Sequence, residues 1–457
     1  MQLTDVLSRI DQDLPEATER LLSLLRIPSI STDPAFKKAC DSAADWLVKD
    51  LLSFGATGQK RTTPGHPMVV GHIGEGSPHV LFYGHYDVQP VDPLDLWDSD
   101  PFDPQLQDGP NGQVIRGRGS SDDKGQLMTF IEACRAWQAV HGSLPCRITF
   151  FFEGEEESGS PSLIPFMQDN KAELSADLAL ICDTGLFESR IPAIVTTLRG
   201  KLGEEIVVTA AGKDLHSGMY GGIAINPIRV LSRILAGLHD DQGRITLPGF
   251  YDGVPPLPDS LRSQWAGLEF DHTAFLADVG LSHPAGEQSK TPLEMIWSEP
   301  TCEINGISGG YTGAGFKTVL PATATAKLSF RLVGQQDPLK IREAFHAYVH
   351  AMLPPDCTVS FGDHGASGAS LMSTDHPAFD AARRALSDEW PGNAAYIGCG
   401  GSIPVAGYFK DITKMDAMLI GFAKDDDQIH SPNEKYDVES FHKGIRSWAR
   451  ILAAISA

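Results

Sequence analysis

Short apolar segments that alternate with amphipathic helical segments constrain the fold more than any other feature of this sequence. Four segments have the length and composition of buried strands: 68–73, 79–83, 147–152 and 178–182. Residues 125–138 lie between the second and the third and gather their apolar side chains on one helical face. Strands that alternate with helices predict an α/β layer with a mostly parallel sheet.

The pattern changes near residue 197. A strand over 205–210 and a helix over 226–238 are followed by a stretch rich in proline and glycine. In 323–333 apolar residues alternate with Thr325, Lys327, Ser329 and Arg331, which predicts an antiparallel sheet that is covered on one face. The strand–helix pattern resumes near residue 376. The chain of 457 residues therefore predicts an α/β domain formed by 1–197 and 376–457, interrupted by an α+β insertion over 198–375.

Charge and cysteine usage exclude several classes of protein. The 59 acidic residues outnumber the 37 lysines and arginines, which disfavours binding to nucleic acids and to anionic membranes. No apolar run approaches the roughly 18 residues that cross a bilayer. The N-terminal segment has the pattern of an amphipathic helix and not that of a signal peptide.

Seven scattered cysteines without a CxxC pair indicate neither a disulfide framework nor a thiolate zinc site, so we expect a cytoplasmic protein.

The first candidate functional cluster is YGHYD at 83–87, where a strand ends. His85 and Asp87 are two residues apart and point the same way in an extended chain. His85 can serve as a metal ligand, with Asp87 as the carboxylate that orients it. The alternative is an ordinary polar strand end.

A second cluster, GRGSSDDKG at 117–125, opens the helix over 125–138. A carboxylate at Asp122 can bridge two cations, or it can simply cap the helix. Ser121 and Lys124 also match the Ser-x-x-Lys spacing of serine β-lactam enzymes, but the partner motifs of those enzymes are missing.

The third cluster places three consecutive glutamates, Glu155, Glu156 and Glu157, shortly after a strand of three phenylalanines. Such a cluster is either a solvated acidic turn or part of a metal site. In a metal site one glutamate binds the cation and its neighbour is a general base. Asp183, at the end of the strand over 178–182, and His430 are further candidate ligands.

Six segments together resemble the M20 family of metallopeptidases, and most closely its carnosinase-like, cytosolic nonspecific dipeptidase branch. They occur in the order that the family shows and span essentially the whole chain. They are GHYDVQP (84–90), GRGSSDDKG (117–125), EGEEESGS (153–160), DLHSGMYGG (214–222), GGSIP (400–404) and HSPNEK (430–435). The resemblance implies that the α/β domain is catalytic and that the insertion over 198–375 is a lid and dimerisation domain.

The resemblance also implies a site with two divalent metal ions. His85, Asp122 and Asp183 would bind one ion, and Asp122, Glu157 and His430 the other. Glu156 would be the general base, and Asp87 would support His85. Three ligand carboxylates leave one positive charge on two divalent ions, which suits a bridging hydroxide. Oxygen and imidazole ligands fit Zn²⁺, Mn²⁺ or Co²⁺, and the sequence does not choose among them.

The substrate side of the site is implied by the same resemblance. Arg331 would hold a substrate carboxylate, and His216 would stabilise the oxyanion from the partner subunit of a homodimer. Thr318 and Ser402 match further positions that contact substrate. From the residues alone, a surface salt bridge at Arg331 and an ordinary loop histidine at His216 remain open.

The expected function is hydrolysis of the peptide bond of dipeptides, or of similar short peptides with a free C-terminal carboxylate. A metal-bridging hydroxide would attack, with Glu156 as the base. One alternative is a deacylase of N-acetyl or N-succinyl amino acids that uses the same metals, and another is a metal-binding scaffold without activity. The long insertion and its DLHSGMYGG segment favour the dipeptidase.

Overall fold

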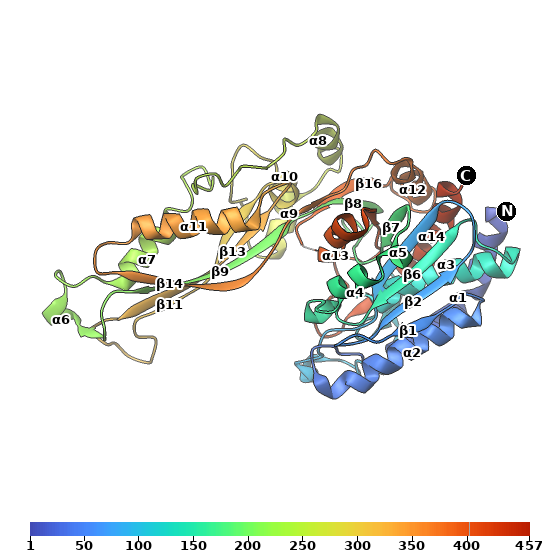
Figure 1. The fold of residues 1–457 in the computed structure, drawn as a ribbon, viewed down its shortest axis with the longest axis horizontal. Coiled ribbons are helices and arrows are strands. Elements are labelled where there is room, and N and C mark those ends of the chain that lie inside the picture. The colour runs from blue at the N-terminus through green and yellow to red at the C-terminus, as the bar shows by residue number, and fades with distance from the viewer. Residues whose placement is uncertain (402) are drawn as a thin grey trace. The chain divides into compact units, whose positions relative to one another are not determined.

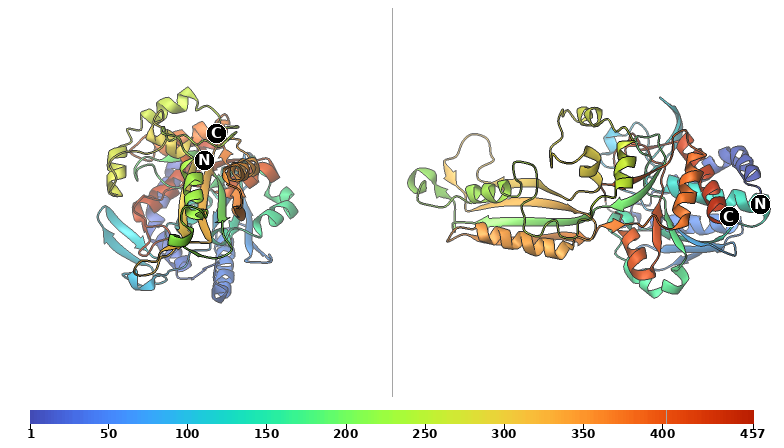
Figure 2. Two further views of the ribbon diagram at one scale, coloured as in Figure 1. Left: turned by 90° about the vertical axis from the view of Figure 1, so that its left-hand side faces the viewer. Right: turned by 90° about the horizontal axis from the view of Figure 1, so that it is seen from above.

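The computed structural model describes residues 1–401 and 403–457, which form two compact units (Figures 1 and 2). Unit 1 consists of residues 1–196, 372–397 and 408–457, and unit 2 consists of residues 197–371 and 398–407. The segment 398–407 therefore groups with the residues of the insertion. The catalytic and lid roles of the two parts stay predictions.

Unit 1 contains a mixed sheet with the strand order β1-β2-β6-β3-β7-β17-β8, and β16 pairs with β8. The central strands β6, β3, β7 and β17 run parallel, whereas β2 and β8 pair antiparallel at the two sides. The strands are β1 (Gln59–Arg61), β2 (Met68–Ile73), β3 (His79–His85), β6 (Arg147–Glu153), β7 (Leu178–Ile181), β8 (Ala193–Leu198), β16 (Ala395–Cys399) and β17 (Asp416–Leu419). The α/β layer with a parallel centre that the sequence predicts is confirmed.

Helices cover both faces of this sheet because its central strands are apolar on both sides. On one face Phe82 of β3 stacks on Phe130 of α3 with ring centroids 3.9 Å apart, and Trp448 of α14 meets both rings edge-on. On the other face Phe151 of β6 stacks on Phe166 of α4. The helices of unit 1 are α1 (Leu3–Leu25), α2 (Lys37–Ser53), α3 (Lys124–His141), α4 (Leu163–Asp169), α5 (Lys171–Leu174), α12 (Pro377–Ser387) and α14 (Val438–Ile455).

A small three-stranded sheet joins distant parts of unit 1. Its order is β18-β5-β4, formed by β4 (Gln105–Gly109), β5 (Gly112–Arg116) and β18 (Lys435–Asp437). Lys435 lies opposite Arg116, so the segment that contains His430 and Glu434 runs beside the loop that leads into α3. This pairing brings the GRGSSDDKG segment (117–125) next to the HSPNEK segment (430–435).

Unit 2 is built on an antiparallel sheet with the order β11-β13-β9-β14. Its strands are β9 (Gly200–Thr209), β11 (Thr301–Gly309), β13 (Thr323–Leu332) and β14 (Thr358–Ser367). The alternate residues of β13 from Ala324 to Leu332 are buried, as predicted, and pack with α7 (Pro227–Ala236) and α11 (Pro338–Met352) in one core. One face of this sheet is therefore covered by these two helices (Figure 1).

The remaining elements of unit 2 are short. A two-stranded ladder pairs β10 (Leu215–His216) with β12 (Val319–Leu320), and α6 (Ser217–Tyr220) follows β10. The stretch rich in proline and glycine leads into α8 (Asp259–Ala266), α9 (His272–Asp278) and α10 (Pro292–Trp297). The other short elements are β15 (Ser370–Leu371), which pairs with the end of β8, and α13 (Pro404–Tyr408). Single helical turns occur at 34–36, 94–96, 156–158 and 409–413.

The predicted boundaries need small corrections. The helix expected over 226–238 spans Pro227–Ala236, because the side chain of Asn226 caps it by accepting a hydrogen bond from the backbone N–H of Ile228. The strand expected over 205–210 is the longer β9, which already begins at Gly200. Among the described residues, no helix has both the length and the apolar composition that crossing a membrane requires.

Candidate active site

The candidate metal ligands lie at one edge of the central sheet of unit 1. His85 ends β3, Glu153 ends β6 directly before the glutamate cluster, and Asp183 follows β7. These three strands are parallel neighbours, so their carboxyl ends meet at the same edge. Asp122 directly precedes Asp123, the N-cap of α3, and reaches this edge from the loop before the helix.

The structure brings the five predicted ligands into two groups that share Asp122. One group is His85, Asp122 and Asp183, the other is Asp122, Glu157 and His430, and within each group the ligating atoms lie within 4.8 Å of one another. The Nε2 atom of His85 is 3.1 Å from Oδ1 of Asp122, and Nε2 of His430 is 2.8 Å from Oδ2. Each carboxylate oxygen of Asp122 therefore faces a different histidine, as a bridging ligand requires.

The electrostatics of this cluster fit divalent cations. Burial and the neighbouring Asp122 raise the pKa of Asp183 well above its ordinary value. Burial would also raise the pKa of Asp122, but hydrogen bonds with His430 and His85 hold it below its ordinary value. The Oε1 atom of Glu157 is buried and has no hydrogen-bond partner among the described residues. Crowded carboxylates and imidazoles with a buried unpaired oxygen are a donor set suited to Zn²⁺, Mn²⁺ or Co²⁺.

Glu156 lies beside this cluster in the helical turn 156–158. Burial raises the pKa of its carboxyl group to about 7, the charge of His85 opposes this shift, and the carboxylates of Glu157 and Asp87 add to it. A carboxyl group with a pKa near neutrality can both accept and release a proton. The position and chemistry of Glu156 are therefore compatible with its predicted role as a general base.

Asp87 holds two parts of the site together. Its backbone oxygen is 3.1 Å from Nδ1 of His85, and its carboxylate oxygen Oδ1 is 3.4 Å from the same ring nitrogen. The carboxylate also accepts hydrogen bonds from the backbone N–H groups of Glu156 (3.3 Å) and Glu157 (3.0 Å). Asp87 thus contacts His85, as predicted, and in addition fixes the backbone of the glutamate cluster.

Neither alternative interpretation of the second cluster matches the contacts. The N-cap of α3 is Asp123, and none of the described side chains caps this helix. The hydroxyl of Ser121 donates to Asp427 at 2.7 Å, whereas Nζ of Lys124 donates to the backbone oxygens of Ile27 and Leu24 at 2.7 and 3.3 Å. The serine and the lysine are thus engaged by different partners and do not form a nucleophile–base pair.

The sequence interpretation missed Glu434, which holds the loop that carries Asp122. Its buried carboxylate accepts hydrogen bonds from the backbone N–H groups of Gly119, Ser121 and Asp122 at 2.9–3.0 Å. It also accepts one from the guanidinium of Arg118 at 2.8 Å. Glu434 belongs to the HSPNEK motif, so the sequence did contain a hint of its importance. However, a carboxylate that accepts hydrogen bonds from backbone N–H groups produces no recognisable spacing of side chains in the sequence.

Two further residues around the ligands were also missed. A carboxylate oxygen of Asp123 accepts the backbone N–H of His85 at 3.0 Å, and the side-chain amide of Gln89 donates to Glu157 at 2.6 Å. Gln89 is part of the GHYDVQP motif, and Asp123 is the second aspartate of GRGSSDDKG. Both contacts hold a predicted ligand in place.

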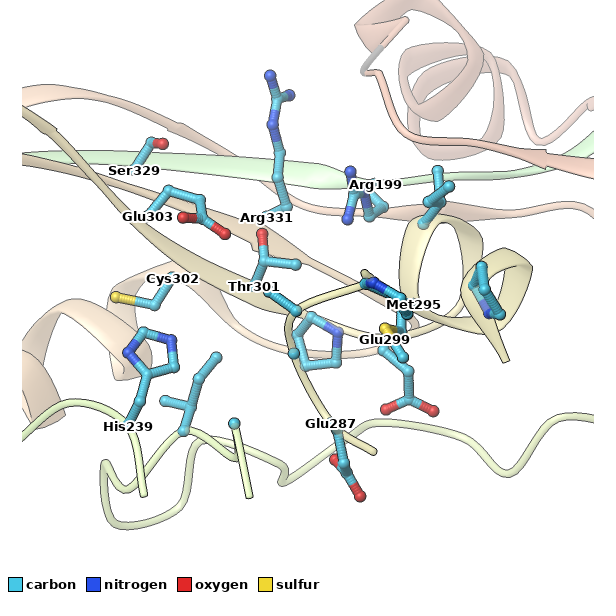
Figure 3. A pocket seen from close by; sticks show the side chains of 18 of the residues that line it. Arg199, His239, Glu287, Met295, Glu299, Thr301, Cys302, Glu303, Ser329 and Arg331 are labelled. Atoms are coloured by element: carbon cyan, nitrogen blue, oxygen red, sulfur yellow. The ribbon is translucent and has the colours of Figure 1, made fainter. Parts of the chain in front are cut away.

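The predicted substrate-binding residues fall in unit 2. His216 and Thr318 are neighbours, since the backbone N–H of Ser217 donates to the oxygen of Thr318 at 3.0 Å. Arg331 lies near the opposite end of β13 and lines a cavity of about 690 Å³ together with Arg199, Thr301 and other residues (Figure 3). Ser402 lies outside the described residues.

Fold and site together define a metal-dependent α/β hydrolase, since carboxylates and imidazoles gather where parallel strands end. Comparison with known proteins specifies the family. The model of peptidase family M20/M25/M40 matches residues 81–454, and the chain belongs to this family. The resemblance noted in the sequence is confirmed, and the protein is an enzyme, a metallopeptidase.

Several dipeptidases are similar to this chain along most of its length. Cys-Gly metallodipeptidase dug1 of Schizosaccharomyces pombe is 30% identical over 100% of this chain and 99% of its own. Beta-Ala-His dipeptidase of Rattus norvegicus is 29% identical over 87% of this chain and 81% of its own. The crystal structure of human carnosine dipeptidase 1 has a TM-score of 0.81 at 27% identity and covers 100% of this chain and 99% of its own.

Proposed function

We propose that this metallopeptidase hydrolyses the peptide bond of dipeptides, or of similar short peptides with a free C-terminal carboxylate, with two divalent metal ions bound per subunit. The observation that carries this proposal is the pair of ligand groups that share Asp122, with Glu156 beside them. The similar proteins support the substrate class, because their names assign them Cys-Gly and β-Ala-His dipeptides.

In this proposal His85, Asp122 and Asp183 hold one cation, and Asp122, Glu157 and His430 hold the other. Zn²⁺ and Mn²⁺ suit these ligands best, and Co²⁺ is compatible with them. When bound, the cations supply Lewis acidity, which polarises the substrate carbonyl and makes water acidic near neutral pH. The charge of the three ligand carboxylates is then compensated in a site that is otherwise crowded with acids.

Glu156 moves the proton in this reaction. Its carboxylate accepts a proton from the attacking water and delivers it to the nitrogen of the leaving amine. Burial and the carboxylates of Glu157 and Asp87 raise the pKa of Glu156, which strengthens it as a base. Asp87 keeps Glu156 in place, because its carboxylate binds the backbone N–H groups of Glu156 and Glu157.

Arg331 is the proposed partner of the substrate carboxylate, which a guanidinium can bind through two parallel hydrogen bonds. His216 and Thr318 would contact the substrate from a second subunit. Arg331 of β13 is eight positions after Thr323, which lies next to the β12 ladder, and at about 3.3 Å per position this is roughly 26 Å. A single dipeptide cannot span that length, so His216 and Arg331 of one chain do not serve one substrate. Ser402, which lies outside the described residues, is the fourth member of the proposed set.

Exposed apolar side chains around His216 support a homodimer through unit 2. Met219 is 76% exposed, Ile223 84% and Phe316 90%, and Tyr220 and Tyr311 are also exposed. Apolar side chains gathered on one exposed surface are typical of protein interfaces. We define these five residues as the apolar tip and propose that it contacts a second copy of the chain.

A cytoplasmic location is part of the proposal. Cys40, Cys134, Cys146, Cys182, Cys302 and Cys357 are free thiols, and five of these six are buried. Free thiols persist in a reducing compartment. Fractionation of the native source, with detection of the protein by an antibody, tests this assignment.

Metal removal tests the proposed function. We expect a chelator to abolish hydrolysis of Cys-Gly and β-Ala-His, and Zn²⁺, Mn²⁺ or Co²⁺ to restore it. Elemental analysis of the restored protein should give about two metal ions per subunit. N-acetyl and N-succinyl amino acids are tested as substrates in the same assay. Faster cleavage of those compounds would identify a deacylase instead, and full activity in the metal-free protein would contradict the proposal.

A further inference from the structure

His430 lies on an exposed loop of unit 1. The residues from Gln428 to Ser431 are exposed, and the side chain of His430 is 52% exposed. Gln428, His430 and Asn433 have backbone φ angles of +57°, +62° and +65°, which lie in the left-handed region. That region is unfavourable for most residues with a side chain, so a loop keeps it only where other contacts fix the loop. The position of His430 should therefore depend on contacts at the ends of this loop.

Three consecutive aspartates precede the exposed residues of the loop, and they differ in burial. Asp425 and Asp426 are exposed, whereas Asp427 is completely buried. Burying a carboxylate is unfavourable unless hydrogen bonds and cations compensate it. The partners of Asp427 therefore indicate what this residue stabilises.

Asp427 contacts both ends of the loop. Its Oδ2 atom accepts a hydrogen bond of 2.9 Å from the backbone N–H of Lys424, and its Oδ1 atom lies 2.9 Å from Nζ of Lys435. The backbone oxygen of Asp427 also accepts the N–H of Lys435 at 3.0 Å. One residue thus holds the two ends of the segment 424–435 together, and this segment carries His430.

The same carboxylate joins this loop to the loop that carries Asp122. The Oδ2 atom of Asp427 accepts a hydrogen bond of 2.7 Å from the hydroxyl of Ser121, the residue directly before Asp122. The Nε2 atom of His430 lies 2.8 Å from Oδ2 of Asp122. Because His430 and Asp122 sit on these two loops, the contact between Asp427 and Ser121 helps to set the separation of the two side chains.

We propose that Asp427 is a positioning residue for His430. Asp427 belongs to neither of the two described ligand groups, and it acts by keeping the loop of His430 closed and attached to the loop of Asp122. The inference rests on the proposed function, in which Asp122, Glu157 and His430 hold one of two cations. Residues that orient a metal ligand contribute to metal affinity although they do not touch the ion.

The effect of Asp427 should be confined to one of the two metal positions. His85 ends β3 and Asp183 follows β7, so strands of the central sheet fix these two ligands. Asp122, which both positions share, is also held by Glu434 through its backbone N–H. Loss of Asp427 should therefore displace His430 and leave the other position intact.

Calorimetric titration of Mn²⁺ into the metal-free, full-length protein tests the inference. In Asp427→Ala we expect the affinity to fall by about 10- to 100-fold at the position that His430→Ala also weakens, and to keep its wild-type value at the other position. Ser121→Ala removes one contact of Asp427 and should weaken the same position by a smaller factor. Asp425→Ala is the matched control, because this aspartate of the same triplet accepts a hydrogen bond from Ser189 at 3.1 Å. Circular dichroism verifies folding, and Ser121→Ala decides the question if Asp427→Ala does not fold.

A measurement without metal separates this inference from the proposed function. In protein with ¹³C-labelled histidine, the Cε1–H resonance of His430 is identified by its absence in His430→Ala. We expect this resonance to shift or broaden in Asp427→Ala and Ser121→Ala, and to keep its position in Asp425→Ala. A wild type that binds a single ion, or that cleaves no dipeptide, contradicts only the proposed function, and the resonance then decides on Asp427. An unmoved resonance, unchanged affinities, or an equal loss of affinity at both positions would overturn the inference while dipeptide hydrolysis stands.

Discussion

Asp122 is the residue on which the site depends most. Each of its two carboxylate oxygens lies about one hydrogen-bond length from a different histidine, and it is the member that both ligand groups share. Its position is set by backbone contacts: Glu434 accepts the N–H of Asp122 itself and that of Ser121. The position of this proposed bridging residue is therefore controlled by a residue far away in the sequence.

The first prediction for a single residue concerns Glu156→Gln. The amide cannot accept a proton, so we expect kcat to fall by about 10²- to 10⁴-fold while metal content stays at the wild-type level. Steady-state kinetics and elemental analysis measure the two quantities. Glu155→Gln is the control, because Glu155 accepts backbone N–H groups of His66 and Ser162 and should affect stability more than turnover. A metal-loaded Glu156→Gln enzyme with wild-type kcat would refute the assignment.

The second prediction concerns Glu434→Gln. The variant places an amide group among N–H donors and removes the charge that pairs with Arg118, so the loop that carries Asp122 should lose its fixed position. Loss of a contact that orients a ligand typically weakens metal affinity by about 10- to 100-fold. Competition with a chromogenic chelator measures this, and excess metal should restore activity. Glu439→Gln, which changes an exposed acid of α14, is the control. An unchanged affinity for both metal ions would argue against the role of Glu434.

Sequence reasoning named the candidate ligands that the structure brings together, and it missed the residues that hold them in place. His85, Asp122 and the glutamate cluster are visible because acids and histidines follow apolar strands at characteristic spacings. Glu434 and Asp123 act on backbone N–H groups, and these partners can be identified only once the loops are folded. Such contacts depend on tertiary structure, so no local sequence pattern predicts them.

Helices α2 and α3 meet through an ion pair that is sensitive to pH. Both carboxylate oxygens of Asp50 on α2 accept hydrogen bonds of 2.7 Å from Arg135 on α3. Burial nevertheless raises the pKa of Asp50 to about 6, against an ordinary value of 3.8, and the charge of Arg135 only partly opposes this effect. The folded protein therefore binds a proton at Asp50 more tightly than the unfolded chain does.

This leads to a prediction for stability as a function of pH. Because the pKa of Asp50 is raised, its protonation contributes to the free energy of unfolding. This contribution is fully present below about pH 4 and is lost as the pH rises through about 6. Relative to Asp50→Asn, which does not titrate, the wild type should lose about 3 kcal/mol of unfolding free energy between pH 4 and pH 7. Denaturant unfolding of both proteins over this range measures the difference. A difference that does not change with pH would contradict the prediction.

At the scale of elements, long periodic segments were predictable and short ones were not. The alternation in β13 identifies this strand because it buries one face, whereas α3 is recognisable from its helical spacing although it is buried almost all round. Helices α8, α9 and α10 follow a stretch rich in proline and glycine and have six to eight residues each, which is too short for a periodic signal. Their positions depend on packing against the rest of unit 2.

At the scale of the whole molecule, the proposed dimer makes a prediction about mixtures of inactive variants. His216→Ala and Glu156→Gln should each be nearly inactive as homodimers. In a mixed dimer one active site receives an intact Glu156 from its own chain and an intact His216 from the partner. Random exchange of subunits should therefore restore about a quarter of the wild-type activity.

The mixture is prepared by unfolding and refolding the two variants together, and its activity is compared with that of each variant treated alone. Phe316→Asp in both chains is the control, because a charge in the apolar tip should prevent subunit association and hence complementation. Complementation that is absent although size exclusion shows dimers would mean that His216 acts within its own chain or does not act at all.

The contact between Glu434 and Asp122 also bears on the order of events during synthesis. The two residues are 312 positions apart in the chain, and His430 belongs to the same late segment. A nascent polypeptide that has left the ribosome only as far as the insertion already contains His85, Asp122, Glu156 and Asp183, but neither the second histidine nor the carboxylate that fixes the bridge. Under the proposed two-metal mechanism the growing chain therefore lacks a complete pair of metal positions, and we expect peptide cleavage only after translation has passed residue 434.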